Sequence, residues 1–505
     1  MNAPHLFTRR HAKGLVTLAA IVALAGPVVA QQAIPAHPDD LVFGELEFEP
    51  PDPATLRHEL PNGVVVFVVE DHELPLVNIS VLMRTGDYTE PALAVPGLAG
   101  LTGSQMRNGG TAALTPSELD EELDFLAAFM GTGIGSTSGN GNLNCLTKDL
   151  DSCLDLLLEI LREPRFDQQR LELAKSQLLQ SMQRRNDSTP RIETREWARL
   201  LRGTTHFSTV ATTEAGITAL TSEDLRAFHG YAVHPGNFVF AISGDVDGAE
   251  ILAKIEAHLA DWAAGEPSGQ VPVPDWEPQP GLYLVHKEDV NQGRISMGHL
   301  GTTRENPDRY ALMIMNHILG GGAFTSRVTS RVRSDEGLAY SAGCQYSFGT
   351  YYDGTFRCFF QSRSEAVARA GAIVIEEIER IRTDEVSEEE LATAKASFIE
   401  TFSRNFASAR QVAGLFANLE LTDRDPDYIK SYRDNVAAVT AEDVLRVAQQ
   451  YLHPDQLLIL AVGNVDDMLA GDSEYPDFSL TALAPGGNVT RIPLPDPMTM
   501  EYPSE

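Results

Sequence analysis

The stretch Ile217-Thr-Ala-Leu-Thr-Ser-Glu-Asp-Leu225 decides the fold, because it returns 219 positions later as Val436-Ala-Ala-Val-Thr-Ala-Glu-Asp-Val444. An internal repeat of this kind defines an architecture before any single motif does. Matching in one order and at one spacing is hard to obtain by chance, so the chain is expected to contain two homologous halves. Two further pairs keep the same offset without a gap: His234-Pro235 with His453-Pro454, and Gly244-Asp-Val-Asp247 with Gly463-Asn-Val-Asp466.

Local patterns around the repeat predict a mixed helix and strand unit. Thr221 and Thr440 each precede acidic residues, as a helix N-cap does, and the apolar runs 238–242 and 457–462 have the length of buried strands. Each half is therefore expected to be an α+β unit of roughly 210 residues, with strands packed against helices. Further strands are predicted at 64–69, 76–83, 281–286 and 293–299, strand pairs within 133–146 and 338–361, and helices at 118–129, 154–161, 366–381 and 388–406.

Length and charge exclude several classes of protein. The chain has 505 residues, of which 43% are hydrophobic and 22% charged, as in an ordinary globular protein. Its 39 Lys and Arg against 71 Asp and Glu give a net charge of −32. Nucleic acids and anionic membranes bind through basic patches, so no nucleic-acid partner is expected. A cationic substrate or partner would be attracted, although a highly solvated surface explains the same charge.

The first thirty residues have the three parts of a secretory signal: a basic start with Arg9 and Arg10, an apolar run 15–25, and a small-residue end at Ala30. We therefore expect a signal peptide at 1–30, a periplasmic mature protein and no membrane span after cleavage, because the apolar run is shorter than the roughly 20 residues that a bilayer requires. The twin arginines leave the export route open.

Breaks in composition divide the remainder. The Pro-rich, acidic stretches 31–53 and 266–280 are interpreted as linkers. They delimit an N-terminal domain at 54–265 and a C-terminal domain at 281–470, followed by an extended tail at 471–505.

Only four cysteines occur: Cys145, Cys153, Cys344 and Cys358. An oxidising compartment permits disulfides, and Cys344 and Cys358 flank a turn-like segment almost symmetrically. A cross-strand bridge and two free buried thiols remain equal alternatives. Spacings of eight and fourteen residues are not typical of a zinc site.

The sequence contains no G-x-S-x-G nucleophile motif, no P-loop, and neither H-E-x-x-H nor H-x-x-E-H. Gly131 to Gly141 alternate with small polar residues as in a strand. His72-Glu73 is typical of solvated surface, and His234 and His453 occupy equivalent repeat positions, which indicates a role in the fold.

The tandem repeat resembles the pitrilysin or insulinase family of inverted-motif zinc peptidases. The residues that carry the resemblance are Gly97-Leu98-Ala99, Asp187 near Pro190, Gly320-Gly-Gly322, and Ser326-Arg327 through Arg333 to Gly337-Leu-Ala-Tyr340. It covers about residues 54–470 and implies two homologous α/β sandwich domains like those of mitochondrial processing peptidase.

Active members of this family carry two zinc-binding histidines and a glutamate that activates water. By that resemblance the histidines fall at Gly100 and Ser104 and the glutamate at Gly103, while the third zinc ligand falls at Gln180 or Ser181. Glycine has no side chain, and serine is a poor zinc ligand. We therefore expect no catalytic residue, metal ligand or cofactor in this chain, and no activity when it is alone.

The second half keeps the residues that bind substrate in the family. The resemblance gives Arg333 the role of donating hydrogen bonds to a peptide carbonyl and Tyr340 that of holding the oxyanion. The alternative is structural, an ion-paired arginine and a packed tyrosine. Gly320-Gly321-Gly322 is either a flexible loop or a helix end with a glycine stop.

These expectations lead to a non-catalytic subunit that binds unfolded peptides and completes the active site of a zinc-bearing homologous partner. A stand-alone peptide-binding or scaffold protein of the same family is the alternative. An enzyme with some undetected ligand set is a third and weaker hypothesis.

Overall fold

The computed structural model describes residues 37, 41, 48–89 and 95–503. The expected signal peptide, 1–30, lies outside the described residues, as does most of the linker expected at 31–53. A compact unit runs from Phe48 to Glu505, and all that follows concerns this unit. Within it, no described helix combines the length and apolarity needed to cross a bilayer.

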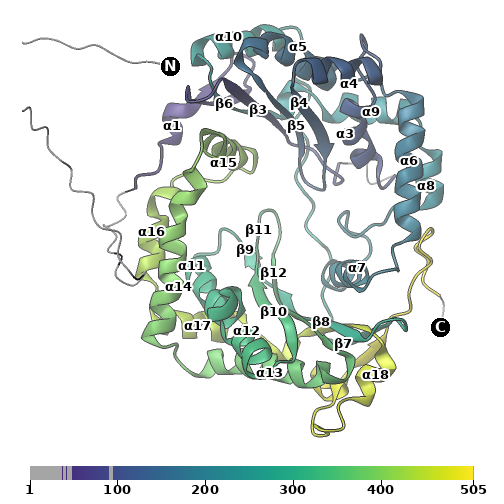
Figure 1. The fold of residues 1–505 in the computed structure, drawn as a ribbon, viewed down its shortest axis with the longest axis vertical. Helices are drawn as coiled ribbons and strands as arrows, with labels where there is room; N and C mark the ends of the chain where they lie inside the picture. The colour runs from purple at the N-terminus through teal and green to yellow at the C-terminus, as the bar shows by residue number, and fades with distance from the viewer. Residues whose placement is uncertain (1–36, 38–40, 42–47, 90–94, 504–505) are drawn as a thin grey trace, which may run out of the picture. The chain divides into compact units, whose positions relative to one another are not determined.

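Two six-stranded sheets form the unit (Figure 1). In the first, β2 and β6 are parallel and the other neighbours antiparallel. Its order is β1 (Arg57–Glu59), β2 (Val65–Glu70), β6 (Phe238–Gly244), β3 (Leu76–Met83), β5 (Gly139–Leu146) and β4 (Phe129–Ile134).

The second sheet repeats the order of the first. Starting at the edge that corresponds to β4 in the first sheet, its strands are β10 (Ala339–Tyr346), β12 (Thr355–Arg363), β8 (Gln292–Leu300), β13 (Leu458–Gly463), β7 (Gly281–His286) and β14 (Val489–Arg491). Here β13, β7 and β14 are parallel, and the remaining pairs are antiparallel. The predicted tandem repeat of homologous α/β domains is therefore confirmed. A small parallel pair joins β9 (Thr302–Thr303) to β11 (Phe348–Gly349).

Helices cover these sheets. Those of the N-terminal half are α1 (Pro53–Leu56), α3 (Leu98–Asn108), α4 (Pro116–Phe125), α5 (Leu150–Arg162), α6 (Gln168–Gln183), α7 (Thr189–Arg202), α8 (Glu214–Ala219), α9 (Ser222–Ala232) and α10 (Gly248–Leu259). Those of the C-terminal half are α11 (Arg309–Asn316), α12 (Arg327–Thr329), α13 (Val367–Thr383), α14 (Glu388–Thr401), α15 (Ala409–Leu421), α16 (Tyr428–Ala438), α17 (Ala441–Tyr451) and α18 (Val465–Ala470). Two π-helical turns, η4 (His317–Gly321) and η6 (Ser330–Asp335), follow α11 and α12.

The repeated Thr residues start helices as predicted. The side chains of Thr221 and Thr440 each accept a hydrogen bond from the backbone N–H three residues later. The carboxylates of Asp224 and Asp443 in turn accept one from the backbone N–H of the threonine. These reciprocal caps fix the starts of α9 and α17. One predicted helix, 118–129, is wrong at its end. The helix stops at Phe125, Ala127 adopts a positive φ of 48°, and Phe129 already begins β4.

Two helices are exchanged between the halves. The apolar face of α15 packs on β2 and β6 of the first sheet, where Phe416 lies against Val65, Phe67 and Val239. Reciprocally, α7 packs against β13 and β8 of the second sheet, and its Trp197 shares an apolar cluster with Leu458 and Leu460 of β13. Figure 1 shows α15 against the first sheet and α7 beside β7 and β8. A helix of each half therefore contributes to the hydrophobic core of the other half.

A buried carboxylate ties the same two halves by charge. Glu193 on α7 is 1% exposed. Its oxygens accept hydrogen bonds from Arg294 Nε at 2.6 Å and Ser296 Oγ at 2.6 Å, and Arg357 Nη2 lies at 3.0 Å. Ion pairs removed from water need this degree of hydrogen bonding to offset the cost of desolvation.

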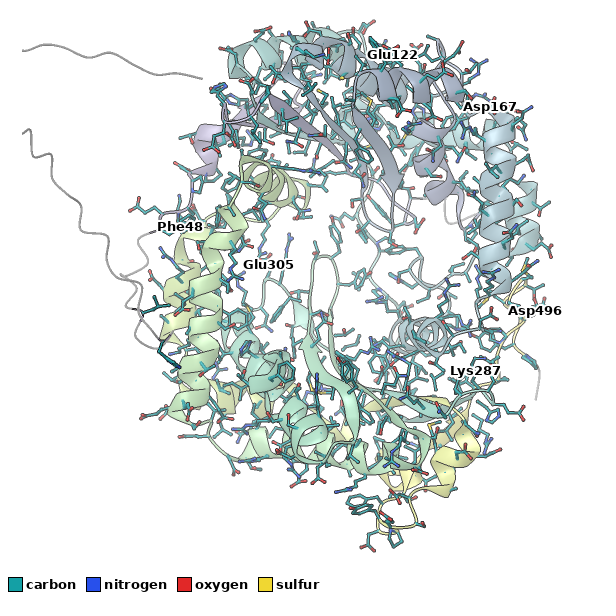
Figure 2. The ribbon with its side chains drawn as sticks, viewed as in Figure 1. Phe48, Glu122, Asp167, Lys287, Glu305 and Asp496 are labelled. Carbon is teal, nitrogen blue, oxygen red and sulfur yellow. A yellow bond between two sulfur atoms is a disulfide. The ribbon has the colours of Figure 1, made fainter. Side chains whose placement is uncertain are left out.

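The tail after residue 471 returns to the N-terminal half. After β14, Pro495 O accepts a bond from Asn186 Nδ2, and Met498 O accepts one from Glu214 N. The Tyr502 hydroxyl donates to the buried carboxylate of Glu196. Figure 2 labels Asp496 within this segment. The tail is therefore a strap whose two ends lie on different halves.

Candidate functional site

Helix α3 carries the positions at which the family resemblance placed zinc ligands. Gly97 precedes it with a φ of 96°, a left-handed conformation that favours glycine. Gly100, Gly103 and Ser104 then lie three and four residues apart, on neighbouring turns of one helix face. Ser104 uses its hydroxyl to donate to Leu101 O. None of the three offers a histidine or carboxylate.

The position that the resemblance gives to the glutamate, Gly103, also has no room for a side chain. A Cβ placed on Gly103 would lie 2.1 Å from Ile134 N and 2.7 Å from Gly133 C, both backbone atoms of β4. Thr132 of β4 links the strand to α3, because its Oγ1 accepts a hydrogen bond from Arg107 N and donates one to Gly103 O. These two backbone groups pair directly in a regular helix. The residues at this position therefore do not fit the zinc chemistry of the active relatives.

Beside α3 there is a pocket of about 600 Å³. Gln180 and Ser181, the predicted third-ligand positions, do not line it. Helix α6 instead presents Gln177, one turn earlier. Within the described ranges no three His, Cys, Asp or Glu side chains gather as a metal site would require. The pocket is lined by Asp87, Pro96, Gly97, Gly100, Leu101, Ser104, Gln105, Asn108, Ile134, Ala174, Gln177, Leu178, Phe207, Val210 and Thr212.

Arg333 and Tyr340 meet in the C-terminal half. Arg333 lies in the π-helical turn η6, and Tyr340 is the second residue of β10, so a helix end and a strand start aim them at one spot. The Arg333 guanidinium lies 4.6 Å from the ring centroid of Tyr340 and 4.6 Å from that of Phe324. Tyr340 is 83% exposed and Phe324 64% exposed. Tyr340 therefore faces solvent, while Arg333 is half-buried and helps Phe324 to line a pocket of about 480 Å³.

Neighbouring arginines in the same segment behave differently. Arg327 binds Glu390 through two hydrogen bonds, and this pairing lowers the pKa of the Glu390 carboxyl to about 2. Arg331 binds Glu376 and Glu377, which raise the pKa of its guanidinium. Arg333 has no carboxylate partner among the described residues. Arg333 is therefore not ion-paired and Tyr340 is not packed, so the structural alternative does not describe this pair.

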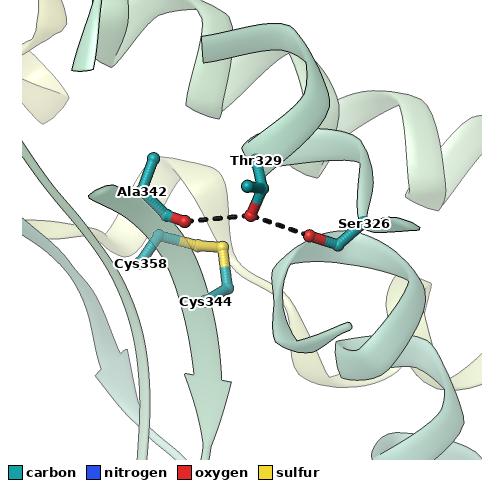
Figure 3. The surroundings of a disulfide bond; sticks show 5 residues. All are labelled: Ser326, Thr329, Ala342, Cys344 and Cys358. Atoms are coloured by element: carbon teal, nitrogen blue, oxygen red, sulfur yellow. Dashed lines mark hydrogen bonds between the residues drawn. A yellow bond between two sulfur atoms is a disulfide. The ribbon is translucent and has the colours of Figure 1, made fainter. Parts of the chain in front are cut away.

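A disulfide holds the strand that carries Tyr340. Cys344 on β10 and Cys358 on β12 face each other in the strand register and are bonded, with Cα atoms 3.9 Å apart. Figure 3 shows how the helical segment is attached beside it: Ser326 Oγ donates to Thr329 Oγ1, which donates to Ala342 O. Cys145 and Cys153 are free and buried.

The remaining candidates have structural roles. Gly320 and Gly321 end η4, and a Cβ on Gly320 would lie 2.3 Å from Cys344 N, so the glycine allows close packing on β10. His234 is buried next to Asn237. His72 pairs with Asp245 at 2.7 Å, not with Glu73. Phe324 was not predicted, because an aromatic residue shortly after three glycines has no characteristic spacing.

Comparison with known proteins agrees with this geometry. Residues 219–398 match the sequence family described as Peptidase M16 inactive domain. An uncharacterised zinc protease of Rickettsia bellii is 22% identical over 72% of this chain and 92% of its own. A protein of Helicobacter pylori named non-peptidase homolog YmxG is 25% identical over 66% of this chain and 77% of its own.

A solved structure has the same fold. The crystal structure of a peptidase M16 inactive domain from Pseudomonas fluorescens superposes with a TM-score of 0.72 at 24% identity, covering 81% of this chain and 97% of that one. The fold and the degenerate α3 define a peptidase homologue without the zinc motif. Over residues 219–398 the chain resembles the pitrilysin or insulinase family, M16.

Proposed function

We propose that this chain is a non-catalytic subunit of a periplasmic insulinase-type metallopeptidase, which binds unfolded peptide and completes the active site of a zinc-bearing homologous partner. The observation that carries the proposal is the contact of half-buried Arg333, which has no carboxylate partner among the described residues, with the exposed ring of Tyr340. By contrast, Arg327 and Arg331 in the same segment are paired with glutamates. The periplasmic location rests on the expected signal peptide at 1–30.

The pair's chemistry suits peptide hydrolysis at a neighbouring metal. Arg333 carries a permanent charge and a fork of N–H donors that can bind a peptide carbonyl. The Tyr340 hydroxyl can donate to the oxyanion that develops when water attacks the carbonyl. Because β10 is the edge strand of its sheet, its backbone can also pair with an extended peptide. The zinc and the glutamate would belong to the partner, since Gly100, Gly103 and Ser104 supply neither.

The test is peptidase activity of the purified mature chain on a long unfolded peptide, alone and mixed with a zinc-motif homologue from the same organism. We expect activity in the mixture, and loss of most of it with Arg333→Ala or Tyr340→Phe. Arg410→Ala and Tyr231→Phe, exposed residues of the same types elsewhere, are the matched controls. Co-elution of the two chains checks that each variant still binds the partner.

The other outcomes assign the protein differently. Full activity of the Arg333 and Tyr340 variants in the mixture would contradict the complementing role. An inactive mixture that still binds peptide would favour the stand-alone binding or scaffold protein. Activity of this chain alone that a chelator abolishes would show a ligand set outside the predicted positions.

A further inference from the structure

The pocket beside α3 has the size and lining of a ligand site. Pockets of about 300–1,000 Å³ with an apolar wall and a few polar groups are typical of small-molecule and side-chain binding, and this one measures about 600 Å³. Its apolar wall comes from three elements and a loop, and consists of Leu101, Ile134, Leu178, Phe207 and Val210.

Two polar groups in this wall have unused capacity to accept hydrogen bonds. Gln105 is 3% exposed, and its Oε1 is buried without a hydrogen-bond partner among the described residues. Asp87 receives one side-chain hydrogen bond there, from Ser136 Oγ at 3.3 Å, and no cation of the described residues pairs with it. Burial raises the pKa of the Asp87 carboxyl, as expected for an acid without a counter-charge.

Both groups are hydrogen-bond acceptors, so a ligand that uses this capacity must be a donor. A partly buried carboxylate without a cation pairs well with a positively charged N–H group. An apolar wall next to it suits the methylene stem of lysine or arginine, which packs on apolar surface while the charged end reaches polar groups. The net charge of −32 would draw such a ligand toward the protein.

We propose that this pocket, at the position where active relatives hold zinc, binds a cationic N–H group of a peptide, with Asp87 and Gln105 as acceptors. The inference rests on the proposed function, since it names the class of peptide that the subunit takes. A lysine or arginine side chain and a free amino terminus share this chemistry, and the experiment separates them.

The experiment measures fluorescence anisotropy of labelled peptides on the full mature chain without any partner. Three otherwise identical alanine-rich peptides are compared: one acetylated with a single arginine, one acetylated with citrulline, which is the neutral isostere, and one with citrulline and a free amino terminus. We expect a cationic peptide to bind at least tenfold more tightly than the acetylated citrulline peptide. A preference for the arginine peptide assigns a side chain to the pocket, and one for the free amine assigns the terminus.

Variants of the chain test whether the preference for a cationic peptide arises in this pocket. Asp87→Asn should abolish it, whereas Asp477→Asn, the same change at an exposed site in the tail, should leave it intact. Gly100→Phe should weaken binding of the cationic peptide by filling the pocket, because a Cβ at Gly100 meets no atom within 4 Å. Thermal unfolding checks that each variant is folded, and the Gly100 variant tests the site even if Asp87→Asn does not fold.

Equal binding of all three peptides, or an unchanged preference in both Asp87→Asn and Gly100→Phe, would overturn the proposal. This failure is distinguishable from failure of the proposed function, because no partner or activity is involved. An Arg333→Ala, Tyr340→Phe chain that keeps full complementation and also keeps the charge preference would contradict the proposed function and support this site.

Discussion

Arg294 Nε lies 2.6 Å from Oε2 of Glu193, although the two residues belong to opposite halves of the repeat. Removing one partner of a buried ion pair leaves the other charge uncompensated, at a cost of about 3–5 kcal/mol. Glu193→Ala should therefore lower the free energy of unfolding by that amount in urea denaturation. Glu121→Ala, an exposed helical glutamate, is the control and should change it by less than about 0.5 kcal/mol. A loss no larger than the control's would mean that the halves are not held together by this charge.

Two glycines on α3 should respond oppositely to the same substitution. Gly100→Ala places a Cβ in open space and should stabilise the helix by about 0.5–1 kcal/mol. Gly103→Ala would push a Cβ into the β4 backbone and should destabilise by at least about 1–3 kcal/mol. Thermal unfolding of both variants measures the difference. By the same steric reason, restoring the motif with Gly100→His, Gly103→Glu and Ser104→His should give a poorly folded protein and no zinc peptidase.

Trp197 and Phe416 occupy equivalent positions of the repeat, and each packs on the sheet of the opposite half. Replacing either by alanine opens a cavity in a core shared by both halves, and each change should cost about 3–5 kcal/mol. Chemical denaturation followed by circular dichroism measures the loss. Phe125→Ala, which removes an aromatic that is 84% exposed, should have little effect. A small effect of Trp197→Ala would show that α7 is not required by the second sheet.

His299 should make stability depend on pH. Burial lowers its pKa to about 4 from an ordinary 6.5, and its Nε2 accepts a bond from His453 N, which protonation would break. Between these values the unfolded chain binds the proton and the folded chain does not, so stability falls as the pH falls from 6.5 to 4.

His299→Gln should reduce that slope by up to about 1.4 kcal/mol per pH unit in urea titrations. His72 is the contrast. The hydrogen bond to Asp245 raises its pKa, so the stability it contributes is present below pH 6.5 and is lost as the pH rises. His72→Gln should leave the acid slope unchanged.

The Cys344–Cys358 bond closes a loop with a sequence separation of 14. Cross-linking a loop of about 15 residues restricts the unfolded chain by roughly 3 kcal/mol. Reduction should therefore lower the melting temperature of the wild-type protein. A Cys145→Ala, Cys153→Ala variant should show the same shift, whereas Cys344→Ser, Cys358→Ser should show none. A shift that persists in the latter would assign the effect to the other pair.

Much of the fold follows from local pattern. The strands at 76–83 and 281–286 begin and end where apolar runs predicted, because a run bounded by turn residues has few alternatives. The caps at Thr221 and Thr440 depend on residues within three positions. The equivalence of the sheets follows from the repeat itself.

What the sequence does not contain is the choice of packing partner. The amphipathic faces of α7 and α15 are visible in the chain, but nothing local says that each covers the other half's sheet. The closure of Gly103 by β4 is likewise a contact between segments distant in sequence.

The exchange of α7 and α15 also has a consequence for how the chain is made. Strands β2 and β6 are synthesised long before α15, so an apolar face of the first sheet must wait uncovered until more than 150 further residues have been added. Contacts of such high sequence separation fold slowly, and exposed apolar surface invites aggregation in the meantime. Neither half expressed alone would have a complete core, and the newly made polypeptide would benefit from a chaperone until its last third arrives.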